Sequence, residues 1–147
     1  MTRADSPAGG ATDYAYDPGS ANLMRRRLGN GSGTYFAYDG ADRVTAIRHA
    51  AADGTPVAYF VYTRDALGRI TRLERESDLA VEYSYDAADR LTAEVWRKAS
   101  DSTQVYAFFY EYDAANNRTK MRREAGAGVE TESGYYGYDG VNGCGTL

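Results

Sequence analysis

The stretch VEYSYDAADRLTAEVW (residues 81–96) decides the fold of this 147-residue chain. Val81, Tyr83 and Tyr85 are two positions apart, so their side chains share one face of an extended strand. Asp86 then opens a short turn, because its carboxylate can accept hydrogen bonds from the backbone N–H groups that follow it. Asp89 tolerates the left-handed conformation that closes a type I turn with a bulge. The stretch therefore predicts a β-hairpin.

The same pattern recurs six times along the chain, each time anchored on an aspartate. Successive aspartates are separated by 22, 26, 21, 27 and 26 residues. These aspartates are Asp17, Asp39, Asp65, Asp86, Asp113 and Asp139. The aromatic residues three positions earlier are Tyr14, Phe36, Tyr62, Tyr83, Tyr110 and Tyr136. The residues immediately before the aspartates are Tyr16, Tyr38, Tyr85, Tyr112 and Tyr138, with Arg64 as the exception.

Residues that tolerate a positive φ follow three positions after five of the aspartates, and they predict where each turn closes. They are Asp42, Gly68, Asp89, Asn116 and Asn142. In the middle copies the return strands begin at Arg43, Arg69 and Arg90, each followed by an aliphatic residue and a threonine. The first and fifth copies are expected to carry one extra turn residue.

These repeats predict an all-β chain, a meandering antiparallel sheet of about eleven short strands, either open or spiralling. Gly- and Asp-rich segments such as LGNGSG and AADGTP are expected to form looser reversals between the copies. A single hairpin is only marginally stable in water, so neighbouring copies must stabilise one another. Residues 1–12 are expected to be a disordered tail, residues 13–142 the array, and residues 143–147 a truncated or degenerate end of the last copy.

The motif resembles the YD repeat of the Rhs proteins, the wall-associated bacterial toxins, the C component of insecticidal toxin complexes and the teneurins. The resemblance rests on three segments of the chain, YFVYTRDALGRIT (59–71), YFAYDGADRVT (35–45) and YSYDAADRLT (83–92). The resemblance implies a β-sheet that spirals into a hollow shell, and in bacterial members this shell encloses a C-terminal toxic domain. The expected partners are then flanking repeats and a C-terminal effector of a longer parent protein. The segment Asp17-Pro18-Gly19 lacks the surroundings of the family's autoproteolysis motif, so no cleavage is expected there.

Composition and charge argue against several classes of function. The net charge of −4 and the pI of about 5.0 argue against nucleic-acid binding, and the basic run Arg25-Arg26-Arg27 is interpreted as a solvated face. No apolar stretch reaches the ~20 residues of a membrane helix, so membrane insertion is not expected. The first residues lack the apolar middle of a signal peptide. We therefore expect secretion or surface display only as part of a larger protein. The single cysteine, Cys144, excludes an internal disulfide.

No residue pattern predicts catalysis, a cofactor or a metal. His49 is the only histidine, and without a nucleophile or an orienting partner it is interpreted as a solvated loop residue. The acid pairs Asp39/Asp42 and Asp86/Asp89 raise a calcium or glycosidase hypothesis, but the alternate oxygen ligands of a calcium loop are absent. Turn capping explains both pairs, so we expect a protein that is not an enzyme.

The tyrosines that recur before the aspartates leave one alternative function open. Exposed rings with polar tips suit a surface adhesion module that binds glycans or a partner protein. Rings at fixed offsets from every turn favour a structural role, because cross-strand aromatic pairs stabilise a sheet. We therefore predict a structural repeat segment and keep adhesion as the alternative.

A piece of such a sheet has strand edges at both ends, and unpaired edges pair with other chains. We expect the isolated chain to self-associate through these edges or to need flanking sequence. Light scattering over a wide concentration range checks this expectation, and a monomer at every concentration would contradict it.

Overall fold

The computed structural model describes residues 2–6, 10–126, 128–139 and 143–146. These residues form thirteen β-strands and none of them is helical, so no helix that could cross a membrane occurs among them. The all-β prediction is confirmed, with two strands more than expected. The chain divides into two compact units, which are described separately: Met1–Arg64 with Leu73–Ser77, and Asp65–Arg72 with Asp78–Leu147.

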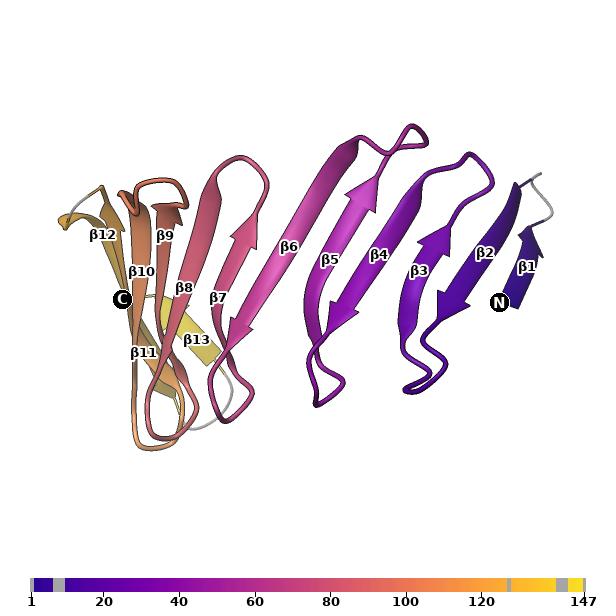
Figure 1. Ribbon diagram of the computed structural model, residues 1–147. Helices are drawn as coiled ribbons and strands as arrows, with labels where there is room; N and C mark the ends of the chain where they lie inside the picture. The colour runs from indigo at the N-terminus through magenta and orange to yellow at the C-terminus, as the bar shows by residue number, and fades with distance from the viewer. Residues whose placement is uncertain (1, 7–9, 127, 140–142, 147) are drawn as a thin grey trace. The chain divides into compact units, whose positions relative to one another are not determined.

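Each unit is an open antiparallel sheet in which neighbouring strands follow the chain order (Figure 1). The strands of the first unit are β1 (Thr2–Ser6), β2 (Gly10–Tyr16), β3 (Leu23–Arg27), β4 (Gly33–Tyr38), β5 (Val44–Ala50) and β6 (Pro56–Arg64). The strands of the second unit are β8 (Leu79–Tyr85), β9 (Leu91–Lys98), β10 (Gln104–Tyr112), β11 (Arg118–Ala125), β12 (Val129–Asp139) and β13 (Gly143–Thr146). Strand β7 (Ile70–Arg75) contributes residues to both units.

The predicted turn geometry is confirmed where the structure describes it. Four residues expected to be left-handed have φ values between 58° and 87°: Asp42, Gly68, Asp89 and Asn116. The strand register shifts next to the tyrosine that precedes the aspartate, for example between Ser84 and Tyr85. This is the bulge that a type I turn with a left-handed closing residue requires. Asn142 lies outside the described residues.

The extra turn residue is present in the first copy but not in the fifth. In the first copy the backbone N–H of Asp17 donates to the carbonyl of Asn22, and Ala21 is the left-handed residue. In the fifth copy Asp113 pairs with Asn117, which is the spacing of the ordinary copies. The prediction for the fifth copy was wrong because Asn117 occupies the position that an arginine takes elsewhere.

Two of the connectors expected to be looser reversals are tight turns. In the segment 28–32 the N–H of Leu28 donates to the carbonyl of Ser32, with Gly31 left-handed at φ 88°. Residues 51–55 repeat this arrangement around Gly54, where φ is 87°. The dipeptides Asn-Gly and Asp-Gly are the sequence signal for such turns.

The structure also describes parts of the two ends. Residues 2–6 lie in β1 and residues 10–12 at the start of β2, with Thr2 opposite Tyr14 and Ser6 opposite Gly10. The backbone groups of these residues are paired between β1 and β2. Residues 143–146 form β13 and pair with the end of β12. The division into tail, array and degenerate end stays a prediction.

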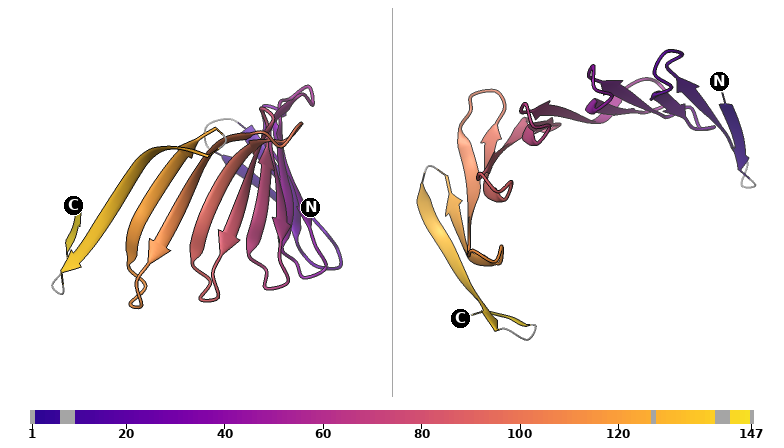
Figure 2. Two further views of the ribbon diagram at one scale, coloured as in Figure 1. Left: turned by 90° about the vertical axis from the view of Figure 1, so that its left-hand side faces the viewer. Right: turned by 90° about the horizontal axis from the view of Figure 1, so that it is seen from below.

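Each unit is a single layer of strands, as the turned views in Figure 2 show. Few side chains are consequently buried. The buried apolar residues are Ala50, Ala80, Val81, Ala93 and Ala107. Val81 is the one large side chain among the described residues that is fully enclosed, and it lies opposite Trp96 in the register of β8 and β9. A sheet of this kind is stabilised by cross-strand neighbours and not by a thick core.

This burial pattern predicts that two substitutions by alanine lower the free energy of unfolding by very different amounts. Val81→Ala removes two enclosed methyl groups and should lower the free energy of unfolding by about 2 kcal/mol. Leu67→Ala, at a residue that is 74% exposed, should change it by less than about 0.5 kcal/mol. Urea denaturation followed by tyrosine fluorescence measures both. Equal losses in the two variants would show that Val81 is not a packing centre.

Candidate functional site: the repeated Tyr-Asp turns

The recurrent structure in this chain is the Tyr-Asp turn, in which the aspartate side chain closes its own loop. In the Asp86 turn, Oδ1 accepts hydrogen bonds from the N–H groups of Ala88 (2.9 Å) and Arg90 (3.0 Å). Oδ2 accepts one from Nε of Arg90 at 2.7 Å. One carboxylate thus fixes the turn backbone and the residue directly before the return strand β9.

The other turns repeat this arrangement with small changes. Asp39 and Asp65 bind Nε of Arg43 at 2.8 Å and of Arg69 at 2.7 Å. At the fifth turn, Nδ2 of Asn117 donates to Asp113 at 3.0 Å. At the first turn, Asp17 accepts instead from the N–H groups of Gly19 and Ser20. The side chains of Tyr138 and Asp139 lie outside the described side chains.

Consecutive turns are also joined to each other. Nη1 of Arg69 donates to Oδ1 of Asp89 at 2.6 Å, across the gap to the following turn. Nη1 of Arg90 donates to the carbonyl of Asp113 (2.9 Å) and to Oδ1 of Asn116 (3.0 Å). The left-handed residue of one turn is therefore the acceptor for the turn before it.

In the first unit the same link is made without an arginine. Nδ2 of Asn22, the last residue of the first turn, donates to Oδ1 of Asp42 at 2.7 Å. This link explains why the left-handed position holds Asp or Asn and not only Gly. Glycine adopts the conformation at lower cost, but it offers no side-chain oxygen.

The tyrosine before the aspartate makes a second connection to the preceding copy at Tyr38, Tyr85 and Tyr112. The hydroxyl of Tyr112 donates to the carbonyl of Leu91 at 2.8 Å, and the guanidinium of Arg90 lies 4.9 Å from the centre of the Tyr112 ring. Tyr85 bonds the carbonyl of Ile70 in the same way, with Arg69 at 4.9 Å from its ring. Cation–π contacts of this kind stabilise the packing of the arginine between two copies.

Tyr38 makes the same kind of bond as Tyr85 and Tyr112: its hydroxyl donates to the carbonyl of Leu23 at 2.9 Å. At the exceptional position, Nη2 of Arg64 lies 3.4 Å from the carbonyl of Val44. Val44 follows Arg43 as Ile70 follows Arg69. Arg64 therefore donates to the same backbone position that the tyrosines reach.

The aromatic residues three positions before the aspartates lie in the strands, away from the turns. Tyr83 and Tyr110 illustrate their surroundings: Tyr83 lies opposite Glu94 in the register, and the Tyr110 hydroxyl donates to Oε1 of Glu94 at 3.1 Å. Burial, together with the nearby charge of Glu94, raises the pKa of Tyr110 to about 12. The remaining members of this set are Tyr14, Phe36, Tyr62 and Tyr136.

The two acid pairs are occupied by these networks. Asp39 and Asp86 close their own turns, while Asp42 accepts from Asn22 and Asp89 pairs with Arg69. In the part of the chain that the structure describes, no group of three or more His, Cys, Asp or Glu residues lies close enough to hold a metal ion. The carboxylates of the turns are thus bound by donors of the chain itself.

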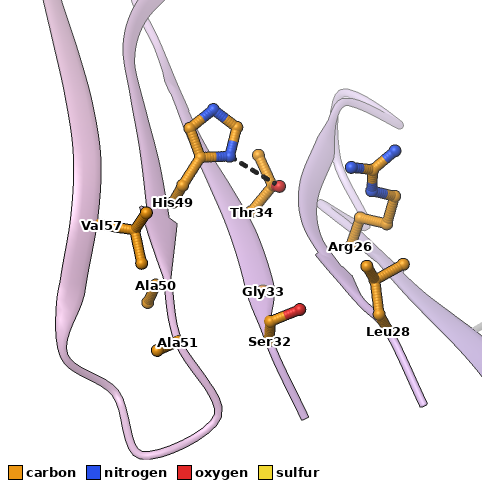
Figure 3. Close-up of a pocket in the computed structure, with 9 residues that line it drawn as sticks. All are labelled: Arg26, Leu28, Ser32, Gly33, Thr34, His49, Ala50, Ala51 and Val57. Carbon is orange, nitrogen blue, oxygen red and sulfur yellow. Dashed lines mark hydrogen bonds between the residues drawn. The ribbon is translucent and has the colours of Figure 1, made fainter. Parts of the chain in front are cut away.

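His49 is not a loop residue. It lies in β5, is half-buried, and its Nδ1 is 3.1 Å from Oγ1 of Thr34. The Phe60 ring packs edge-on against it, with the ring centres 6.3 Å apart. The loop interpretation was wrong because β5 continues to Ala50, beyond the point where the sequence turns polar. His49 and Thr34 face a hollow of the first unit (Figure 3).

Part of the chain matches a known family model. Residues 64–95 match the family model of the RHS repeat, which confirms the resemblance to YD-repeat proteins. No curated protein matches the chain. The sequence repeats, the turn geometry and this match together define an RHS-type structural repeat segment.

Solved structures with the same fold are parts of Tc toxins. The crystal structure of TcdB2-TccC3-Cdc42 matches with a TM-score of 0.75 and 25% identity over 88% of this chain. The Photorhabdus luminescens Tc holotoxin pore with a mutation in TccC3 matches with a TM-score of 0.74 and 25% identity over 87% of this chain. In both cases the chain spans 6% of the matched chain's length.

The links between turns predict unequal effects of two similar substitutions. Arg90→Gln removes the bonds to Asp86, Asp113 and Asn116, and should lower the free energy of unfolding by about 2 kcal/mol. Arg43→Gln removes an ion pair to Asp39 from a side chain that is 41% exposed, and should cost less than about 1 kcal/mol. Urea denaturation of both variants checks the difference, and a larger loss for Arg43→Gln would refute the role of the link.

Because the turns depend on charged carboxylates, we also predict that the folded chain becomes less stable in acid. Backbone N–H donors and the arginine side chain hold the pKa of Asp86 below its ordinary value, and the pKa values of Asp17, Asp39, Asp65 and Asp113 are lowered by similar donors. A lowered pKa stabilises the fold above the unfolded value of about 3.9, and this stabilisation disappears as the pH falls through the folded value.

The urea midpoint should therefore stay constant from about pH 7 to pH 5 and fall below about pH 4. Asp86→Asn removes one titrating turn, so this variant should show a smaller decrease between the same pH values. A decrease as steep as that of the unmodified chain would mean that other groups cause the acid lability.

Proposed function

We propose that this segment forms part of the wall of a shell in an exported Rhs-like protein, and that the shell encloses or presents a C-terminal effector domain. The single observation that carries the proposal is the set of links from turn to turn, from Asn22 to Asp42, from Arg69 to Asp89 and from Arg90 to Asn116. Such links serve to fix one copy against the next. They suit a sheet that extends by adding copies and has both faces uncovered by other elements.

The comparisons support the wider setting. The segment corresponds to 6% or 7% of the chains it matches, so a long parent protein with flanking repeats is the natural context. One matched structure is TcdB2-TccC3 without a hypervariable C-terminal region. By analogy, the proposed partners of this segment are flanking repeats and a variable C-terminal effector, and the proposed location is outside the producing cell.

The role proposed for the recurrent residues is mechanical and not catalytic. The aspartates fix the turns, the tyrosines and arginines join neighbouring copies, and Gly68 with the other left-handed residues closes the loops. The hydroxyl bonds of Tyr38, Tyr85 and Tyr112 to strand carbonyls support this assignment. Those three hydroxyls are engaged within the sheet, which favours a structural role over glycan binding for these rings.

The test uses the parent polypeptide, expressed with the sequence that flanks this segment in its gene. If the segment is part of an enclosing wall, limited trypsin digestion should leave the C-terminal domain intact. Arg69→Gln combined with Arg90→Gln should expose that domain to cleavage, and Arg43→Gln should not. Rapid cleavage of the C-terminal domain in the unmodified protein, or a gene that encodes no such domain, would refute the proposal.

A further inference from the structure

The first unit contains a hollow of about 380 Å³ that the repeat pattern does not explain. Residues of β3, β4, β5 and the start of β6 line it, together with residues of the turns between them, and the lining combines polar and apolar side chains (Figure 3). Its size is at the lower end of the range for small-molecule sites. The Tyr-Asp turns and their links take no part in it.

A row of polar side chains runs along one side of this hollow. Arg26, Thr34 and His49 are register partners on three adjacent strands, so they point to the same face of the sheet. Figure 3 shows the Arg26 guanidinium, the Thr34 hydroxyl and the His49 ring side by side. In the described part of the chain, Arg26 makes no ion pair, in contrast to the arginines of the turns.

Thr34 is the buried member of this row. The residue is 6% exposed, and its hydroxyl is 3.1 Å from Nδ1 of His49. If Nδ1 carries the proton, the imidazole donates to Oγ1 and the hydroxyl proton becomes available to a ligand. Arg26 and Thr34 can then both donate to one anionic group, and the tautomer of His49 is set by that group.

The other side of the hollow is apolar. Leu28 is 39% exposed and Val57 is 63% exposed, and the buried Ala50 also lines the hollow. A ligand that covers Leu28 and Val57 removes their apolar surface from water, which favours binding. The site therefore suits a molecule with an anionic head and an aliphatic tail.

We propose that this hollow binds an aliphatic carboxylate, with the carboxylate on Arg26 and Thr34 and the tail against Leu28 and Val57. The shape and the charge leave two sources of this chemistry, a free acid and the C-terminal residue of a polypeptide. Binding depends on β3 to β6 of the first unit, and it is independent of whether the sheet encloses an effector.

The experiment is a titration of the ¹⁵N-labelled 147-residue chain with isocaproate, followed by NMR. We expect saturable shifts confined to the amides of residues 26–34 and 49–57, with a Kd of about 1 mM for so small a ligand. Isocaproamide, which has the same shape without the charge, should bind at least about tenfold more weakly. No saturable shift with isocaproate, or equal binding of the amide, would overturn the proposal.

Two variants separate the pocket from general attraction to arginine. Arg26→Gln should weaken isocaproate binding about tenfold, since it removes the charged donor. Arg27→Gln is the matched control: it removes the same charge from the next residue, which alternates to the opposite face of β3, and it should leave the Kd unchanged. Equal losses in the two variants would contradict the assignment.

A short peptide ending in leucine identifies the source of the ligand. If the natural ligand is the C-terminus of a polypeptide, the peptide with a free C-terminus should bind more tightly than isocaproate. The same peptide with an amidated C-terminus should not bind. If the free acid binds more tightly, the natural ligand is a small acid. Tight binding of the amidated peptide would show that the carboxylate is not recognised and would overturn the proposal.

Discussion

The structure depends on one carboxylate in each turn. Oδ1 of the aspartate accepts two backbone N–H groups, and Oδ2 binds the side chain four residues later, as Asp65 does with Arg69. The aspartate makes these bonds only when the closing residue is left-handed, so the carboxylate selects one turn geometry. The bulge next to the tyrosine follows from this geometry, and the bulge sets which faces of the strands carry the rings.

Because each unit is a single layer, its strands are stabilised mostly by their neighbours. The few enclosed residues are small, and three of them, Ala80, Val81 and Ala107, lie on β8 and β10 of the second unit. On one face of that unit, Glu82 binds Arg72 at 3.0 Å and Arg97 at 2.8 Å. On the other face Trp96 stacks on Tyr106, with the ring centres 5.1 Å apart. Local side-chain networks thus take the place of a common core, as in other repeat proteins.

The sequence alone predicted the parts of the fold that depend on local chemistry. Asp42, Asp89 and Asn116 indicated the left-handed positions, and the Tyr-Asp steps indicated the hairpins, because both signals lie within a few residues of each other. The links from Asn22 to Asp42 and from Arg90 to Asn116 could not be predicted, since they join residues 20 and 26 positions apart and need the sheet register. His49 was misplaced for a related reason. Its partner Thr34 lies on another strand, and that contact extends β5 past the polar residues.

The link between each turn and the next has a mechanical consequence. Each copy contacts only the copies beside it, so a force applied across the strands is carried by the interfaces in series. The weakest interface then determines the load at which the whole array opens. At the β5–β6 interface Arg64 takes the place of the tyrosine and reaches the carbonyl of Val44, so the side-chain link of this interface differs from the tyrosine links of Tyr38, Tyr85 and Tyr112.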